Sequence, residues 1–427
     1  MKANYLLKTK GAEALYEVAR DLPIIDFHNH LSLSDISSDR QFDNIYDLWL
    51  ASDPYKHRLM RISGIPEHFI TGDASPYEKF EKYADVFPFL AGNPVYDWAR
   101  MELSFIFGVD VPLCHENARK IYDLTSEMLK SPEFSNNAIL KKFGIEYNSP
   151  VATLFDSLSD YNGKSLAPSL RADDLLTPDD KLFATLTKRT GVKITDERSY
   201  INAISVILDE FAKKGCRFAD HSLDYDFFEN DKEGKKKNLL TMLGNEYAKR
   251  KWTLLLHLGA KRQTSSRLRS VAGAAGGYAA VGGGFDIPRV VDLLNGMECS
   301  GGLPDTVLFP LNMSDQAAFS VMQGSFSEDG VASKVQLGPA WWWCDNILGI
   351  ENTLNCISSF GLVSRFIGMT TDSRSILSFV RHDYFRRLAC SWLDEISTRN
   401  DWELSDKTLE EFIKKICYRN AKEKIKI

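Results

Sequence analysis

Short apolar runs of strand-forming residues alternate with helical stretches along this chain, and this alternation constrains the fold more than any other feature. Strands that alternate with helices are typical of a parallel sheet, because a crossover must return the chain to the same edge after each strand. The runs that read as strands are residues 24–28, 151–155, 165–170, 216–219, 252–258, 306–311, 334–337 and 365–371. Eight such units predict an α/β fold of the TIM-like (β/α)8 barrel class.

A long helical segment interrupts this alternation after the first predicted strand. Apolar residues recur there at three- and four-residue spacing, as in FDNIYDLWLAS and ENARKIYDLTSEMLK, which is typical of amphipathic helices. We therefore expect three parts: residues 1–31 with an N-terminal helix and the first barrel strand, residues 32–147 as a large helical insertion, and residues 148–427 with the rest of the barrel and a C-terminal helix.

The segment GAAGGYAAVGGG, residues 273–284, is the one compositionally biased stretch. A phosphate-binding loop would need Lys-Ser or Lys-Thr after its glycines, and this segment has neither. We interpret it as a mobile loop of the barrel.

Charge and composition argue against several classes of partner. The formal net charge is -6 without a basic stripe, which disfavours nucleic acid and anionic membranes. No apolar run reaches the roughly 20 residues of a membrane span, and the N-terminus lacks the apolar core of a signal peptide. The seven cysteines are scattered without a C-x-x-C pair, as expected of reduced thiols. These features predict a cytoplasmic protein; the oligomeric state is open, with a homo-oligomer as one option.

Polar residues end several of the predicted strands, where the active site of a TIM-like barrel lies. The first strand ends in His28 and His30, whose i, i+2 spacing puts both imidazoles on one side, where they can hold a cation. His257 and Asp372 end two further strands. Singly, these residues have ordinary interpretations, such as a buried core histidine or a helix N-cap. Together they predict a metal centre at the mouth of the barrel.

These strand-end residues resemble the metal-dependent amidohydrolase superfamily, and within it the uronate isomerase (glucuronate isomerase) family. The resemblance covers essentially the whole chain and rests on segments such as DFHNHL, FDNIYDLWL, GCRFADHSLD and GMTTDSRSILSFVRHDYFRR. It implies a role in carbohydrate metabolism, with D-glucuronate converted to D-fructuronate and D-galacturonate to D-tagaturonate. Such an isomerisation passes through a cis-enediolate and needs a base and a stabilised oxyanion.

The resemblance also implies individual roles. A divalent metal, expected to be one zinc ion, would be held by His28, His30 and Asp372. The expected catalytic residues are Asp372 as the base for the C2 proton, with Tyr55 or His257 moving the hydroxyl proton. The expected substrate-binding residues are Arg171, Arg374, Trp341 and Trp342, of which the arginines suit a hexuronate carboxylate.

The chain departs from the family pattern at some positions, and two other functions stay open. Pro54 stands where the family has a histidine, and Arg262-Gln263-Thr264 stands where it has Arg-Asn-Asn. One alternative is a metal-dependent hydrolase of the same superfamily; against it, the fourth strand has no lysine to bridge two metals. The other is a catalytically weak sugar-acid-binding relative. An assay for ketohexuronate formation separates all three.

Overall fold

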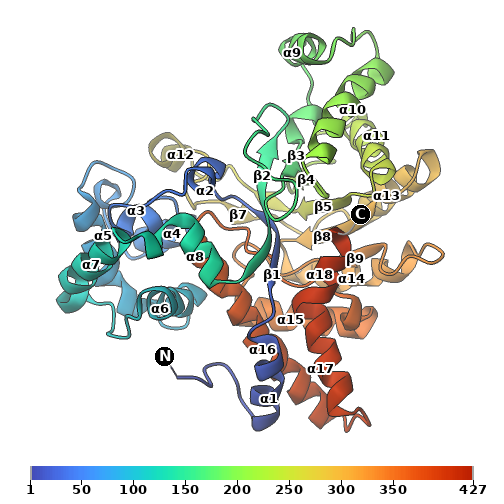
Figure 1. Cartoon of the computed structure of the whole chain (residues 1–427). Coiled ribbons are helices and arrows are strands. Elements are labelled where there is room, and N and C mark those ends of the chain that lie inside the picture. The colour runs from blue at the N-terminus through green and yellow to red at the C-terminus, as the bar shows by residue number, and fades with distance from the viewer. Residues whose placement is uncertain (1, 426–427) are drawn as a thin grey trace.

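The computed structural model describes residues 2–425, and a curled parallel sheet lies at its centre (Figure 1). The strands are hydrogen-bonded in the order β1-β2-β3-β4-β5-β8-β9, and all of these pairs are parallel. Their bounds are β1 (Ile24–Asn29), β2 (Ile145–Thr153), β3 (Ser169–Arg171), β4 (Phe218–Leu223), β5 (Thr253–Leu258), β8 (Asp305–Pro310) and β9 (Val335–Leu337). The predicted α/β class with a parallel sheet is confirmed.

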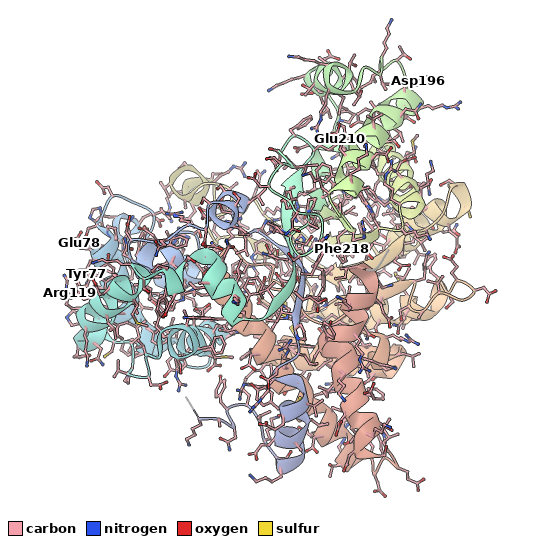
Figure 2. All side chains as sticks on the ribbon, viewed as in Figure 1. Tyr77, Glu78, Arg119, Asp196, Glu210 and Phe218 are labelled. Carbon is pink, nitrogen blue, oxygen red and sulfur yellow. The ribbon has the colours of Figure 1, made fainter. Side chains whose placement is uncertain are left out.

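The interior of the sheet is apolar and closely packed. Every residue of β1 and β5 is buried, as expected of strands that have other elements on both faces. Phe27 of β1 stacks on Phe218 of β4 with 5.4 Å between ring centroids, and Figure 2 shows Phe218 near the centre of the molecule. The polar strand ends thus stand on a rigid support.

Between β1 and β2 the chain is helical, and these helices group on the left of Figure 1. They are α2 (Leu33–Ser37), α3 (Ile45–Trp49), α4 (Pro54–Ile62), η1 (Glu67–Phe69), α5 (Pro76–Val86), η2 (Phe87–Leu90), α6 (Pro94–Phe107), α7 (His115–Leu129), η3 (Pro132–Phe134) and α8 (Asn136–Lys142). Proline in the first turn follows a polar N-cap in α4, α5 and α6, which is a strong local start signal. Figure 2 shows Tyr77 and Arg119 together at the outer edge of this group, where α5 and α7 pack.

The remaining helices precede β1 or follow the later strands. They are α1 (Lys10–Ala19), η4 (Asp173–Leu176), α9 (Asp180–Thr190), α10 (Glu197–Lys213), α11 (Lys235–Lys249), α13 (Ile287–Ser300), η5 (Met313–Asp315), α14 (Gln316–Ser325), α15 (Ile347–Phe360), η6 (Val363–Arg365), η7 (Ile376–Phe379), α16 (Val380–Arg399), α17 (Asp406–Lys414), the π-helix η8 (Lys415–Arg419) and α18 (Asn420–Ile425). The predicted C-terminal helix is therefore present as α17, η8 and α18 in succession. None of the helices in the described part of the chain has the length and apolar content to cross a membrane.

The first seven predicted strands exist, but some of their ends were wrong. β2 begins at Ile145, earlier than predicted, because the polar stretch before residue 151 still pairs with β1. β4 continues to Leu223, past the predicted end at residue 219. The expected division into residues 1–31, 32–147 and 148–427 stays a prediction.

The eighth predicted strand, residues 365–371, was wrong: it forms no ladder with the sheet in the described chain. Just after it, the Asp372 N–H donates to the His28 carbonyl at 3.1 Å, and the Ser373 carbonyl accepts from the His30 N–H at 2.8 Å. Asp372 has a φ of 47°, and a left-handed residue interrupts the regular spacing that a ladder needs.

Side chains take over part of the missing strand pairing. The buried Asp26 carboxylate on β1 accepts hydrogen bonds from the Thr371 N–H at 2.7 Å and the Thr371 hydroxyl at 2.9 Å. On the other side, the Gln336 side chain of β9 accepts from the Ile367 N–H at 2.8 Å. The segment therefore contacts both outer strands, β9 and β1.

The chain after β5 forms a small separate sheet. β6 (Ala260–Lys261) pairs antiparallel with β7 (Ala280–Val281), and α12 (Ser266–Ala272) lies between them in sequence. The glycine-rich stretch thus has local structure, while its predicted mobility stays a prediction.

Candidate active site

A cavity of about 300 Å³ lies beyond the ends of β1, β3, β4, β6 and β9. This volume is at the lower end of the range of roughly 300–1,000 Å³ that is usual for small-molecule sites. Its lining residues are His30, Asp53, Pro54, Tyr55, Arg171, Asp224, Arg262, Gln263, Arg269, Ala274, Ala275, Gly277, Ala279, Trp341, Trp342, Asp372, Ser373, Arg374, Ser375 and Arg381.

The structure brings His28, His30 and Asp372 together at one end of this cavity. Their potential ligand atoms all lie within 4.8 Å of one another, and Asp372 Oδ1 is 3.3 Å from His28 Nε2 and 3.2 Å from His30 Nε2. Burial lowers the pKa of His30, which favours the neutral imidazole that a metal ion needs. Burial raises the pKa of Asp372, but the two histidines outweigh burial and hold this pKa well below its usual range.

The surroundings of His28 indicate whether these three residues suit a metal ion. Its side chain is fully buried, and among residues 2–425 neither ring nitrogen makes a well-aligned hydrogen bond, although Nε2 approaches Asp372 Oδ1 to 3.3 Å. A buried polar atom without a partner is costly, and a bound cation would remove that cost. Two imidazoles and one carboxylate also form a donor set that divalent ions accept, so these residues fit a metal ion.

His257 is buried on β5 and is not among the residues that line the cavity. Its Nδ1 lies 2.6 Å from Asp220 Oδ1, and its ring centroid lies 4.9 Å from that of His28 and 4.7 Å from that of Phe309. Burial lowers the pKa of His257, although the Asp220 carboxylate opposes this. His28, Asp220 and His257 also form a second group of convergent potential ligands.

Arg171 and Arg374 both line the cavity, but they are held differently. Arg171 ends β3 and donates from Nε to the buried carboxylate of Asp220, which lies opposite it in the register of β3 and β4. Burial lowers the pKa of Arg171, but Asp220 outweighs burial and raises it. Arg374 has no hydrogen-bonded or ion-paired side-chain partner among the described residues. Its guanidinium is therefore available to an anionic ligand.

Tyr55 enters the cavity from the first turn of α4. Its ring packs edge-to-face against Trp98 and Trp343, with centroid distances of 5.6 Å and 4.8 Å. Its hydroxyl donates to Asp345 Oδ2 at 3.0 Å. Burial and the Asp345 carboxylate raise the pKa of Tyr55 well above its usual range, so the phenol is neutral at physiological pH.

Trp341 and Trp342 form an apolar part of the cavity wall. Their rings stack at 5.6 Å, and the Trp341 indole N–H donates to the Phe309 carbonyl at 2.9 Å. Trp342 and Trp343 have φ values of 34° and 49°, a left-handed conformation that bulky residues rarely adopt. Such strain is typical of functional sites.

Residues 262–279, which we call the lid, supply one side of the cavity. Arg58 and Arg61 on α4 donate hydrogen bonds to backbone carbonyls of the lid. Gly277 has a φ of 81°, and a Cβ added there would lie 2.2 Å from the Pro54 carbonyl oxygen. Only glycine therefore fits this contact, and the lid packs directly on Pro54.

Sequence reasoning assigned no role to Asp220, Asp345 or Arg381, which the structure places at the site. Asp220 had a signal, because it directly follows the apolar run at residues 216–219. Asp345 and Arg381 had no such signal, because Asp345 lies in the loop after β9, just beyond Trp341–Trp343, and Arg381 lies in the first turn of helix α16. The roles proposed for the remaining site residues stay predictions.

Comparisons with known proteins agree with this architecture. The chain matches the family model described as glucuronate isomerase over residues 1–239 and 227–424. A uronate isomerase from Caldanaerobacter subterraneus subsp. tengcongensis is 36% identical over 466 residues, covering 99% of this chain and 98% of the relative. One from Bacillus pumilus is 35% identical over 462 residues, covering 99% and 96%. The crystal structure of uronate isomerase from Thermotoga maritima has a TM-score of 0.90 at 25% identity, covering 100% and 99%. The chain therefore belongs to the glucuronate isomerase family and is an isomerase.

Proposed function

We propose that this isomerase interconverts D-glucuronate and D-fructuronate, and D-galacturonate and D-tagaturonate, through a cis-enediolate. The observation that supports this best is the positive charge of the cavity wall next to a possible cation site. Among the described residues, three aspartates line the cavity together with Arg171, Arg262, Arg269, Arg374 and Arg381. A hexuronate brings a carboxylate, which planar guanidinium groups bind in a bidentate manner.

The proposed cofactor is one zinc ion held by His28, His30 and Asp372. The buried ring nitrogens of His28, which make no well-aligned hydrogen bond among the described residues, and the lowered pKa of His30 support a divalent cation, and the nitrogen-rich donor set favours zinc. When bound, such an ion would polarise substrate oxygens and stabilise the charge of the enediolate.

In this proposal one residue moves the carbon-bound proton and another moves the hydroxyl proton. Asp372, whose carboxylate is kept ionised by the two neighbouring histidines, takes the proton from C2 and returns it to C1. Tyr55 moves the hydroxyl proton between O2 and O1. His257 is the alternative for this second role, and its position off the cavity wall makes it the weaker one.

The proposed substrate-binding residues are Arg171 and Arg374, with Trp341 and Trp342 against the apolar face of the sugar. Arg374→Lys keeps the charge but removes the bidentate fork, so we expect kcat/KM to fall about thirtyfold, or roughly 2 kcal/mol of transition-state binding. Arg171→Lys should show a loss at least as large, because it also weakens the contact with Asp220. Steady-state kinetics on both uronates measures this, and unchanged kinetics in both variants would exclude the role.

An assay of the purified protein tests the function itself. We expect ketohexuronate to form from uronate, to stop after a chelator removes divalent metal, and to resume when zinc is added. Hydrolysis of an amide or ester without ketose formation would support the hydrolase alternative. Binding of uronate without turnover, at full metal content, would support the sugar-acid-binding alternative.

We also propose that residues 366–373 complete a closed (β/α)8 barrel in place of an eighth regular strand. Their contacts with β1 and with Gln336 of β9 support this closure. A cytoplasmic location is proposed as well, and it is supported by the seven free cysteines, since reducing compartments keep thiols free.

A further inference from the structure

Asp345 lies between β9 and α15, and only 4% of its side chain is exposed. Its Oδ2 accepts a hydrogen bond from the Tyr55 hydroxyl at 3.0 Å and another from Arg381 Nη1 at 3.2 Å. The other oxygen, Oδ1, makes no hydrogen bond with any described residue. A buried carboxylate with an unused oxygen is costly, and this one lies beside a tyrosine that lines the cavity.

The ring of Tyr55 has little freedom to turn away from this carboxylate. Trp98 and Trp343 pack against its edges and faces, and the Arg381 guanidinium lies 4.9 Å from its ring centre. Trp343 is itself held in a left-handed backbone conformation two residues before Asp345. The fold therefore directs the hydroxyl of Tyr55 at Asp345, and Tyr55 also lines the cavity.

The charges around Asp345 suit a carboxylate that can accept a proton for a short time. Burial raises the pKa of Asp345 to about 6, and the Arg381 guanidinium on α16 limits this rise. Tyr55 on α4 donates to the carboxylate, and Asp372 faces it from the segment before η7 and raises the pKa further. At neutral pH Asp345 is ionised, yet its pKa is close enough to pH 7 for efficient proton acceptance.

We propose that Asp345 is the positioning residue of Tyr55 and the transient acceptor of its proton, an inference that rests on the proposed isomerisation. The O2–H bond of the substrate breaks and its proton moves to the Tyr55 oxygen, while the Tyr55 O–H proton moves to Asp345. The transfers then reverse at O1: Tyr55 gives its proton to O1 and regains one from Asp345. Protons and charge balance, and no oxidant or reductant is needed.

The test compares two rates in the zinc-loaded Asp345→Asn variant. Asparagine has nearly the same shape and accepts a hydrogen bond from Tyr55, but it cannot hold another proton. We expect ketose formation to fall about 100-fold, while exchange of the C2 hydrogen with solvent deuterium falls less than about threefold. The two rates separate because Asp372 carries the C–H step and is not altered.

Asp383 offers a matched control away from the cavity. It accepts hydrogen bonds from the Tyr16 hydroxyl and from Arg387 Nε, at 2.8 Å for the latter, so it repeats the trio of tyrosine, aspartate and arginine. Asp383→Asn is expected to leave exchange and ketose formation unchanged.

A second variant, Tyr55→Phe, allows the same comparison of rates if Asp345→Asn does not fold. Tyr55→Phe removes the hydroxyl and leaves the ion pair between Asp345 and Arg381 intact, and we expect it to give the same separation of the two rates. Equal losses of exchange and ketose formation in both variants would overturn the proposal, because a merely structural role disturbs both steps alike. Unchanged ketose formation in folded Asp345→Asn would overturn it too. Failure of the proposed function is distinct, since the wild-type protein would then form no ketose.

Discussion

The Asp372→Asn variant is expected to lose C2 hydrogen exchange and ketose formation together, with ketose formation about 10⁴-fold below wild type even after zinc is restored. Asparagine keeps the size of the side chain, but its neutral amide cannot take the C2 proton. It also removes the charge that lies 3.3 Å from His28 and 3.2 Å from His30, so metal affinity should fall as well. Deuterium incorporation at C2 and bound zinc are both to be measured.

Measuring zinc content separates the two ways in which Asp372→Asn can fail. Zinc-loaded Asp372→Asn that shows no exchange leaves Asp372 as the base, whereas zinc-loaded Asp372→Asn that still exchanges the C2 hydrogen of the substrate would transfer this role, first of all to Tyr55. Tyr55→Phe is the comparison, because it should retain exchange while ketose formation falls.

Asp220→Asn is expected to lower the free energy of unfolding by about 3–5 kcal/mol, the usual cost of breaking a buried ion pair on one side. Asp220 is fully buried between the Arg171 guanidinium and Nδ1 of His257. Removing its charge leaves the half-buried Arg171 guanidinium with only the more distant carboxylate of Asp173, at 4.0 Å, as a partner. Because Arg171 lines the cavity, the affinity for uronate should fall too. Urea unfolding of the two proteins at pH 7 measures the change.

The difference in free energy of unfolding between wild type and Asp220→Asn should also depend on pH. Burial raises the pKa of Asp220, but Arg171 and His257 outweigh burial and hold it well below its usual range. A carboxylate with a lowered pKa stabilises the folded protein above the unfolded-state value of about 4, and this stabilisation is lost as pH falls through the folded-state pKa. The advantage of wild type over Asp220→Asn should therefore persist from about pH 7 to 5 and shrink below about pH 4.

An exposed ion pair provides the control for Asp220→Asn. Asp209 pairs with Arg250 at 2.6 Å, and 64% of the Asp209 side chain is exposed. Asp209→Asn should cost less than about 1 kcal/mol, because water already solvates this carboxylate. An equally small loss in Asp220→Asn would mean that Arg171 does not depend on Asp220 for its charge balance.

Local sequence pattern predicted those site residues whose position follows from their own strand. His28 lies on β1 and His30 directly follows that strand, and His257 lies near the end of the apolar run of β5. Arg171, at the end of β3, was predicted from the family resemblance instead. Asp220 was missed although it belongs to the same class. What makes it important is its place opposite Arg171, and this depends on the register of β3 against β4.

The sequence by itself therefore determined the alternation of strands and helices, the parallel sheet, and the polar residues at the strand ends, because each depends on the local periodicity of side chains. Only the tertiary structure decided which of these residues meet. Asp26 and Gln336 replace an eighth regular strand, the lid packs on Pro54, and Asp345 faces Tyr55. These contacts join residues far apart in the chain, and packing among non-local elements selects them rather than any pattern in one segment.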